Sequence, residues 1–240
     1  MDEPGEDADV ETSSESYARR FAGPVGAWFL EVQARATLDL LAPWPGARVL
    51  DVGGGHAQIT APLVDAGYDV TVYGSAEACG QRLRAWTEAG RARFQAGDLL
   101  RASWPDRAFD VVICYRLLAH ARRWRDLVAE LGRLARHAVL VDYPSQRSVN
   151  AAADALFHLK KGVEGNTRPF AVFRDADVAS AFTAHGFEPT RRRPEFFLPM
   201  ALHRALGSAP LAKALEGGAA ALGLARACGS PVILRLERRG

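Results

Sequence analysis

Short apolar runs alternate with stretches of helical periodicity through the middle of this chain. Apolar and β-branched clusters predict strands, and apolar residues that recur every three or four positions predict helices. The expected strands are 48–52, 69–73, 91–95, 109–114 and 138–141, and the expected helices between them are 58–66, 77–89 and 124–136. This alternation predicts an α/β fold with a doubly wound, mostly parallel sheet and helices on both faces, because parallel neighbours need a crossover. Ligands of such sheets bind at the carboxyl ends of the strands.

The pattern changes on both sides of this region. After Pro144 we expect helices over 149–161, 175–185 and 210–227, a strand near Phe187 and a last strand over 231–237, which completes seven strands. Before the first strand, helical spacing over 17–41 is broken at Gly23 and Pro24. Two short helices joined by a kink are predicted there.

The first sixteen residues have a different composition. They hold seven acidic side chains, no basic ones and almost nothing apolar. Such a segment cannot bury enough apolar surface to offset its ordering entropy, so residues 1–16 are predicted to be a disordered acidic tail. Without them, 21 acidic residues face 30 Lys and Arg, and the body is formally about +9.

The basic body raises the question of a nucleic-acid partner. Arginines cluster at 122–125, 191–193 and 235–239, but few aromatic residues interleave with them. We interpret the clusters as solvated faces and expect no specific nucleic-acid site.

Location and metal content follow from two further features. The acidic start lacks the flanks of a secretory signal, and no uncharged apolar run approaches the roughly 18 residues of a membrane span. Cys79, Cys114 and Cys228 show no CxxC spacing, so neither a disulfide framework nor a metal site is expected. These features predict a cytoplasmic protein with reduced thiols; its oligomeric state stays open.

The most informative segment lies between the first predicted strand and its helix. It reads Asp51, Val52, Gly53, Gly54, Gly55, His56 and Ala57. Glycines let the backbone turn tightly and let a ligand lie against it, while a helix start offers free N–H groups. The segment is predicted to be a nucleotide-binding loop.

Two departures speak against a dinucleotide. The spacing is not GxGxxG, and Asp51 stands two places before the first glycine, where a carboxylate disfavours pyrophosphate but suits an ammonium group. The second strand ends in Tyr73, Gly74 and Ser75, without the acid that would hold the ribose of NAD.

The sequence DVGGGHA resembles the DxGxGxG motif of class I S-adenosylmethionine-dependent methyltransferases, with Ala57 in place of the third glycine. Gly97–Asp98–Leu99 resembles the adenine-binding turn of that family, and Phe109–Asp110–Val111–Val112 resembles its fourth-strand motif. The stretch 117–136 is similar to the branch that includes the ubiquinone and menaquinone biosynthesis methyltransferases. The resemblance covers 17–144 well and the rest in outline, and it implies a Rossmann-like fold.

The resemblance implies S-adenosyl-L-methionine as cofactor and assigns residues to it. Gly53 and Gly55 would contact the methionine moiety through their backbone, Asp51 would orient its amino group, Asp98 would accept a hydrogen bond from the adenine amine, and Leu99 would pack on the ring. The usual ribose acid is missing, so Ser75 or Glu77 must substitute for it. The full expected cofactor set is Asp51, Gly53, Gly54, Gly55, Ala57, Gly74, Ser75, Asp98, Leu99 and Tyr115.

Methyl transfer from a sulfonium is a direct displacement, so positioning supplies much of the catalysis and no nucleophilic side chain is needed. A hydroxyl acceptor benefits from a base, and His120, just beyond the fourth strand, is the candidate. A structural role for His120 remains open. His56, inside the glycine loop, is interpreted as structural.

The resemblance also divides the chain. Residues 17–46 would form a helical lid in which Tyr17, Phe21, Trp28 and Phe29 present ring faces to the sulfonium, or are simply core. Residues 47–240 would form the methyltransferase domain, with a substrate-pocket insertion at about 145–174. The expected substrate contacts are Tyr17, Phe21, Trp28, His158, Arg168 and Phe170.

Three functions stay in competition. A methyltransferase acting on a small molecule is favoured. A nucleic-acid methyltransferase is disfavoured because the fourth strand ends in Ile113–Cys114–Tyr115–Arg116, which is neither the Asn/Asp-Pro-Pro-aromatic motif nor a Pro-Cys nucleophile. A non-catalytic S-adenosylmethionine-binding protein of the same fold would fit the missing ribose acid.

Overall fold

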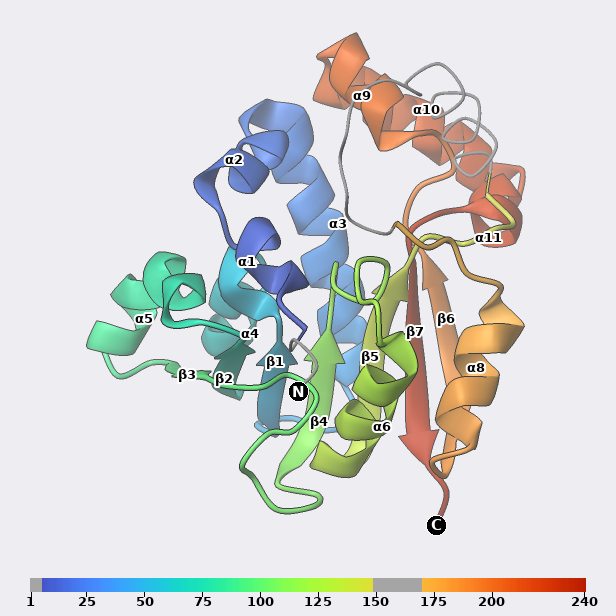
Figure 1. Cartoon of the computed structure of the whole chain (residues 1–240). Coiled ribbons are helices and arrows are strands. Elements are labelled where there is room, and N and C mark those ends of the chain that lie inside the picture. The colour runs from blue at the N-terminus through green and yellow to red at the C-terminus, as the bar shows by residue number, and fades with distance from the viewer. Residues whose placement is uncertain (1–5, 149–169) are drawn as a thin grey trace.

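The chain forms one seven-stranded sheet with helices on both faces (Figure 1). The computed structural model describes residues 6–148 and 170–240. The strands are β1 (Arg48–Val52), β2 (Asp69–Gly74), β3 (Arg93–Ala96), β4 (Phe109–Cys114), β5 (Ala135–Tyr143), β6 (Phe187–Pro194) and β7 (Val232–Arg238). Their order is β3-β2-β1-β4-β5-β7-β6; β7 runs antiparallel to its neighbours β5 and β6, and the other neighbouring strands are parallel. The Rossmann-like fold expected from the sequence is confirmed.

Helices connect the strands and cover the sheet. On and between the first strands they are α3 (Gly23–Leu41), α4 (Thr60–Asp65), the 3-10 helix Glu77–Leu83, α5 (Arg84–Glu88) and α6 (Trp124–Leu134). In the C-terminal part they are α8 (Asp175–Thr183), α9 (Met200–Leu206), α10 (Ala209–Ala221) and α11 (Leu224–Cys228). Among the described residues, no helix combines the length and apolar character that a bilayer crossing requires.

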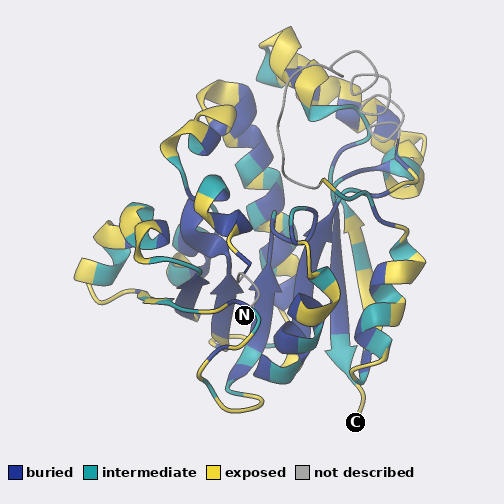
Figure 2. Ribbon diagram, viewed as in Figure 1, coloured by how far each residue is buried: buried dark blue, intermediate teal, exposed yellow. Residues whose placement is uncertain are grey.

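The core consists of two layers because side chains of the central strands alternate between the sheet faces. Leu50, Val112 and Val139 belong to the layer that contains α6 and α8 residues. Val49, Val111 and Leu140, one position away, belong to the layer under α3 and α4. Burial on both faces explains why these strands read as continuous apolar runs (Figure 2).

Several element boundaries differ from the sequence-based expectation. The helix expected over 77–89 is a 3-10 helix followed by the short α5, and the helix expected over 210–227 is divided into α10 and α11 at Gly223, whose φ is 73°. The helix α9 was not expected. The break before α3 occurs where expected: Gly23 has a φ of 75° and Pro24 occupies the first turn, where its missing N–H is not needed.

The acidic N-terminus is the main correction. Residues 6–16, expected to be disordered, include α1 (Ala8–Thr12) and the start of α2 (Glu15–Ala18), and α1 lies at the carboxyl ends of β1 and β2 (Figure 1). Apolar burial is not what orders this segment. The carboxylates instead pair with the basic body: Glu6 accepts a hydrogen bond from the Arg123 backbone at 3.0 Å, and Glu15 pairs with Arg82 at 2.5 Å. Residues 1–5 lie outside the described part.

Candidate active site

The loop after β1 has the tight geometry that its glycines allow. Gly53 is left-handed, with a φ of 76°, and its N–H donates to the Tyr73 carbonyl at 2.8 Å, which ties the loop to the end of β2. A Cβ on Gly54 would lie 2.0 Å from Asp51 Oδ2, and a Cβ on Gly55 would lie 2.3 Å from Ser13 Oγ. No side chain can be added at these two positions without a rearrangement.

Ala57 marks the departure from the glycine motif. It adopts a φ of 60°, in the left-handed region where a Cβ collides with the backbone. The loop therefore keeps the backbone shape that a third glycine would favour, and the alanine is strained there. Alanine in place of the third glycine therefore makes the loop conformation less stable but does not change its backbone shape.

Beneath the loop lies a carboxylate without a partner. Asp51 is fully buried, and neither of its oxygens has a hydrogen-bond partner in the described part of the chain. Burial, with the nearby Asp142 charge as a second cause, raises the pKa of Asp51 to about 7. A buried acid next to a glycine cradle is the arrangement that an ammonium group would complete. The loop thus fits the methionine moiety of S-adenosylmethionine on its own geometry.

The end of β2 is held by the N-terminal segment. Ser75 donates to the Asp9 carboxylate twice, from its backbone N at 2.8 Å and from its hydroxyl at 2.5 Å. Asp9 is completely buried, and its Cβ lies 3.6 Å from where a Cβ on Gly53 would be. The sequence has no acid at the end of β2, where one would hold the ribose. In the folded protein, Asp9 of α1 places a carboxylate there. Glu77, the other expected substitute, begins the 3-10 helix after Ser75.

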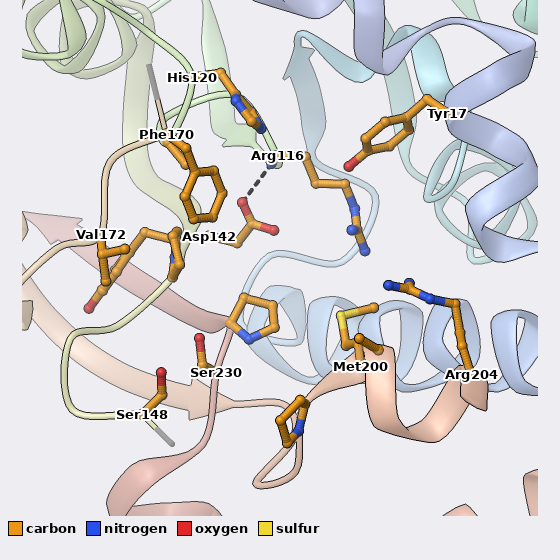
Figure 3. A pocket seen from close by; sticks show the side chains of 16 residues that line it. Tyr17, Arg116, His120, Asp142, Ser148, Phe170, Val172, Met200, Arg204 and Ser230 are labelled. Atoms are coloured by element: carbon orange, nitrogen blue, oxygen red, sulfur yellow. Dashed lines mark hydrogen bonds between the residues drawn. The ribbon is translucent and has the colours of Figure 1, made fainter. Parts of the chain in front are cut away.

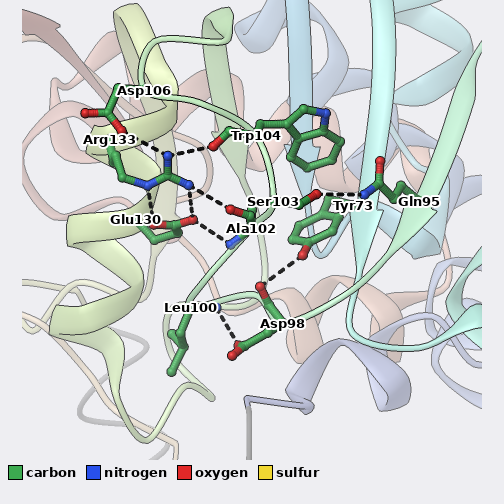
Figure 4. A network of polar contacts seen from close by, with 10 residues as sticks. All are labelled: Tyr73, Gln95, Asp98, Leu100, Ala102, Ser103, Trp104, Asp106, Glu130 and Arg133. Carbon is green, nitrogen blue, oxygen red and sulfur yellow. Dashed lines mark hydrogen bonds and ion pairs between the residues drawn. The ribbon is translucent and has the colours of Figure 1, made fainter.

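The turn after β3 is braced against α6 (Figure 4). Asp98 Oδ1 accepts a hydrogen bond from the Leu100 N–H at 2.9 Å, and the Asp98 carbonyl accepts one from the Tyr73 hydroxyl at 3.0 Å. Further along, Arg133 of α6 donates to the Trp104 and Ala102 carbonyls at 2.7 and 3.0 Å and pairs with Glu130. Asp98 thus stabilises the turn, and its exposed carboxyl group remains available to a ligand; Leu99 beside it is buried.

A cavity of about 260 Å³ opens beside the ends of β4 and β5 (Figure 3). His120 and Phe170 lie on its wall with ring centroids 5.5 Å apart, so the structure brings these two expected residues together. Asp142, at the end of β5, also lines the cavity and accepts a hydrogen bond from the Arg116 backbone at 2.6 Å. β4 pairs with β1, with Ile113 opposite Asp51, so the cavity at the end of β4 lies next to the glycine loop.

The remaining expected residues separate into groups. Tyr17 lines the cavity, and the Phe21 ring packs on the Arg116 guanidinium at 4.4 Å. Trp28 and Phe29 pack instead against Phe196, with ring centroids 5.2 and 5.0 Å away, in a cluster between α3 and the C-terminal helices.

Tyr115 directs its hydroxyl to Thr37 of α3 at 3.0 Å. His158 and Arg168, with most of the expected insertion at 145–174, lie outside the described residues. His56 is buried and its Nδ1 accepts a hydrogen bond from the Gln58 N–H; burial lowers its pKa to about 3, so it is neutral at physiological pH.

Sequence reasoning missed Asp9 and three residues that line the cavity, Arg116, Asp142 and, from α9, Arg204. For Arg116 and Asp142 a signal existed. Arg116 lies two residues after β4 and Asp142 lies near the end of β5, where a doubly wound sheet binds its ligands. Asp9 was missed because it lies in the acidic segment that was predicted to be disordered. Arg204 was missed because its helix, α9, was not predicted.

Comparison with known proteins agrees with this geometry. Residues 49–138 match a family model described as a methyltransferase domain. A segment of 82 residues is 39% identical to the demethylmenaquinone methyltransferase of Beutenbergia cavernae, and it spans about a third (32%) of each protein. This match covers too little of that enzyme to assign its activity to this chain.

Solved structures share the fold over a larger part of the chain. Magnesium protoporphyrin IX methyltransferase from Synechocystis, crystallised with S-adenosylhomocysteine, superposes with a TM-score of 0.66 at 15% identity and covers 96% of this chain and 98% of that one. The cyclase SpnF superposes with a TM-score of 0.60 at 20% identity, over 86% and 79% of the two chains.

The fold is that of an α/β protein, and its candidate site lies at the carboxyl ends of β1, β2 and β4. Residues 49–138 match a methyltransferase domain, and the chain shares its fold with methyltransferases crystallised with S-adenosylmethionine or S-adenosylhomocysteine.

Proposed function

We propose that this protein transfers the methyl group of S-adenosyl-L-methionine to a small molecule bound in the cavity beside β4 and β5. The observation that carries the proposal is the unpartnered, buried Asp51 under a glycine cradle, adjacent to a cavity large enough for a small acceptor. The cofactor supplies an activated methyl group on a sulfonium. The protein binds both partners, aligns them and excludes water.

Each residue has a role in this proposal. The backbone of Gly53 and Gly55 receives the methionine moiety, ionised Asp51 pairs with its ammonium, and Asp98 receives the adenine amine. His120 lies on the cavity wall, where it can accept a proton from a hydroxyl acceptor. An acceptor that is already ionised needs only to be positioned.

The N-terminal helix must move for this site to be filled. Asp9 and Ser13 of the N-terminal segment lie within van der Waals distance of the space over Gly53 and Gly55, which the methionine moiety would use. We infer that α1 covers the loop in the free protein and withdraws when the cofactor binds. A mobile covering segment over a cofactor site is a common way to exclude water from a reaction.

A non-catalytic protein of the same fold is the second candidate, and the same contact of α1 with the loop favours it. In that case Asp9 and Ser75 would keep the loop closed. The two candidates differ in turnover: purified protein incubated with methyl-labelled cofactor and a panel of phenols, quinols and amines should give labelled product. Cofactor binding without label transfer to any of them would favour the second candidate.

Substrate class and location are part of the proposal. The cavity favours a small acceptor over a nucleic acid, and several basic side chains are engaged in ion pairs, among them Arg133 with Glu130 and Arg193 with Asp39. The three cysteines are free thiols, which fits a reducing compartment, and we place the protein in the cytoplasm.

A further inference from the structure

Two guanidinium groups point toward one another across the acceptor cavity (Figure 3). Arg116 follows β4, and Arg204 comes from α9; both line the cavity. Neither forms an ion pair with a carboxylate within residues 6–148 and 170–240, and the buried Nε of Arg116 has no hydrogen-bond partner there. Like charges that face each other without a shared counterion are unfavourable, so the pair is arranged for an anion.

The surroundings hold Arg116 in place for such a role. Its φ of 58° is in the left-handed region, which is strained for a residue with a side chain. Its backbone N–H is fixed by Asp142, and its guanidinium lies 4.4 Å from the Phe21 ring centroid and 3.5 Å from Gln33 Oε1. A strained backbone and a packed side chain together present the donor groups of Arg116 in one orientation.

Nearby acids offset at most one of the two positive charges. Asp142 is the one carboxylate among the described residues on the cavity wall, and burial raises its pKa to about 6. Glu195 lies close to Arg116, but burial raises its pKa to about 8, so it is mostly protonated at neutral pH. Burial and the charges of Arg20 and Arg116 lower the pKa of Arg204, as expected where positive groups gather. The cavity therefore keeps a net positive charge.

The rest of the cavity wall is apolar. Phe170, Val172, Pro199 and Met200 contribute carbon surface, and the Tyr17 hydroxyl lies beside Arg116. A guanidinium presents a planar fork that matches the oxygens of a carboxylate or phosphate.

We propose that the methyl acceptor is an acid: a small molecule with an apolar body and one oxyanion, a carboxylate or phosphate, bound between Arg116 and Arg204. This inference rests on the proposed function in treating the cavity as the acceptor site. It adds the substrate class that the proposed function leaves open.

The test is a binding measurement that needs no turnover. The full-length protein is titrated with 2-naphthoate, 2-naphthyl phosphate and neutral 2-naphthamide, followed by NMR. We expect at least one acid to bind about 10- to 100-fold more tightly than the amide, the range for hydrogen bonds to a charged group. The tighter of the two acids identifies the oxyanion.

Variants locate the preference. Arg204→Met should remove most of it, Arg204→Lys should keep part of it, and Arg35→Met, an exposed arginine of α3 outside the cavity, should leave it unchanged. Equal binding of acid and amide, a preference that survives Arg204→Met, or no binding of either acid at millimolar concentration would overturn the inference. Acid binding without any methyl transfer would instead reject the proposed function alone.

Discussion

The carboxylate of Asp9 accepts two hydrogen bonds from Ser75, one from the backbone N and one from the hydroxyl, at the point where β2 ends. The end of β2 has no acid of its own, and this protein brings one there from 66 residues away in the sequence. The contact closes α1 over the glycine loop. The N-terminal segment is therefore packed against the candidate site.

Replacing Asp9 by Ala is expected to tighten cofactor binding. Charge-assisted hydrogen bonds contribute about 1.5–3 kcal/mol, and their loss favours the open segment, so affinity for S-adenosylhomocysteine should rise about tenfold or more. Calorimetric titration measures this, with Asp7→Ala, an exposed acid two residues away, as the control. Weaker binding by Asp9→Ala would mean that the carboxylate holds the cofactor rather than competing with it.

Ala57→Gly should stabilise the protein. The left-handed conformation of Ala57 is unfavourable by about 1–2 kcal/mol relative to glycine, and loss of its partly buried methyl group offsets some of that gain. We expect the free energy of unfolding in urea to rise by up to about 1 kcal/mol. Ala61→Gly, inside α4, should have the opposite sign, because glycine is unfavourable in a helix. A destabilised Ala57→Gly protein would show that this loop is not strained.

Much of the fold could be predicted because its signals are local. The strands β1, β2 and β4 are continuous apolar runs bounded by turns, and their positions were predicted to within a residue. The acidic segment was mispredicted because its order depends on contacts with residues distant in sequence, such as Ser75 and Arg123. Composition shows that the segment lacks apolar surface, but it does not show which hydrogen-bond donors elsewhere in the fold its carboxylates contact.

Of the candidate site, too, only the parts with a local sequence pattern could be predicted. The glycine loop and Asp98 are recognisable because one short segment contains the whole pattern. The pairing of Arg116 with Arg204 is not recognisable, since the two residues lie 88 positions apart in the sequence and α9 is too short to have clear periodicity. Sequence spacing cannot show that two such groups face one cavity.

The pH dependence of stability should reveal Asp51. Its pKa is raised from 3.8 to about 7, so the folded state binds a proton more tightly than the unfolded state does. Between about pH 4 and 7 the unfolded chain is ionised while the folded one is not, and wild type should lose about 1.4 kcal/mol of stability per pH unit as pH rises, relative to Asp51→Asn. The difference should level off above about pH 7.

Chemical denaturation of both proteins at several pH values measures this. His56, whose depressed pKa acts in the opposite direction below about pH 6.5, is common to both proteins and cancels in the comparison. A stability difference that does not change with pH would show that Asp51 is already ionised in the folded protein.

His120→Ala tests the proposed base. If His120 takes a proton from the acceptor, kcat should fall about 100-fold or more while cofactor affinity stays unchanged, because His120 lines the acceptor cavity. The matched control is His185→Ala, which lies at the end of α8. Turnover at the wild-type rate would return His120 to a structural role and leave positioning as the source of catalysis.

The most direct test of the account is a calorimetric titration of S-adenosylhomocysteine into wild type, Gly53→Val and Gly67→Val. Gly53 and Gly67 are both left-handed, with φ of 76° and 85°, but only Gly53 lies in the proposed site, so the second variant controls for backbone strain. Circular dichroism verifies that each protein is folded, and Asp98→Ala, expected to weaken binding by about 1–3 kcal/mol, supplies a variant without such strain. We expect wild type and Gly67→Val to bind S-adenosylhomocysteine and Gly53→Val not to bind it. Unchanged affinity in a folded Gly53→Val protein, or no binding by wild type, would contradict this expectation.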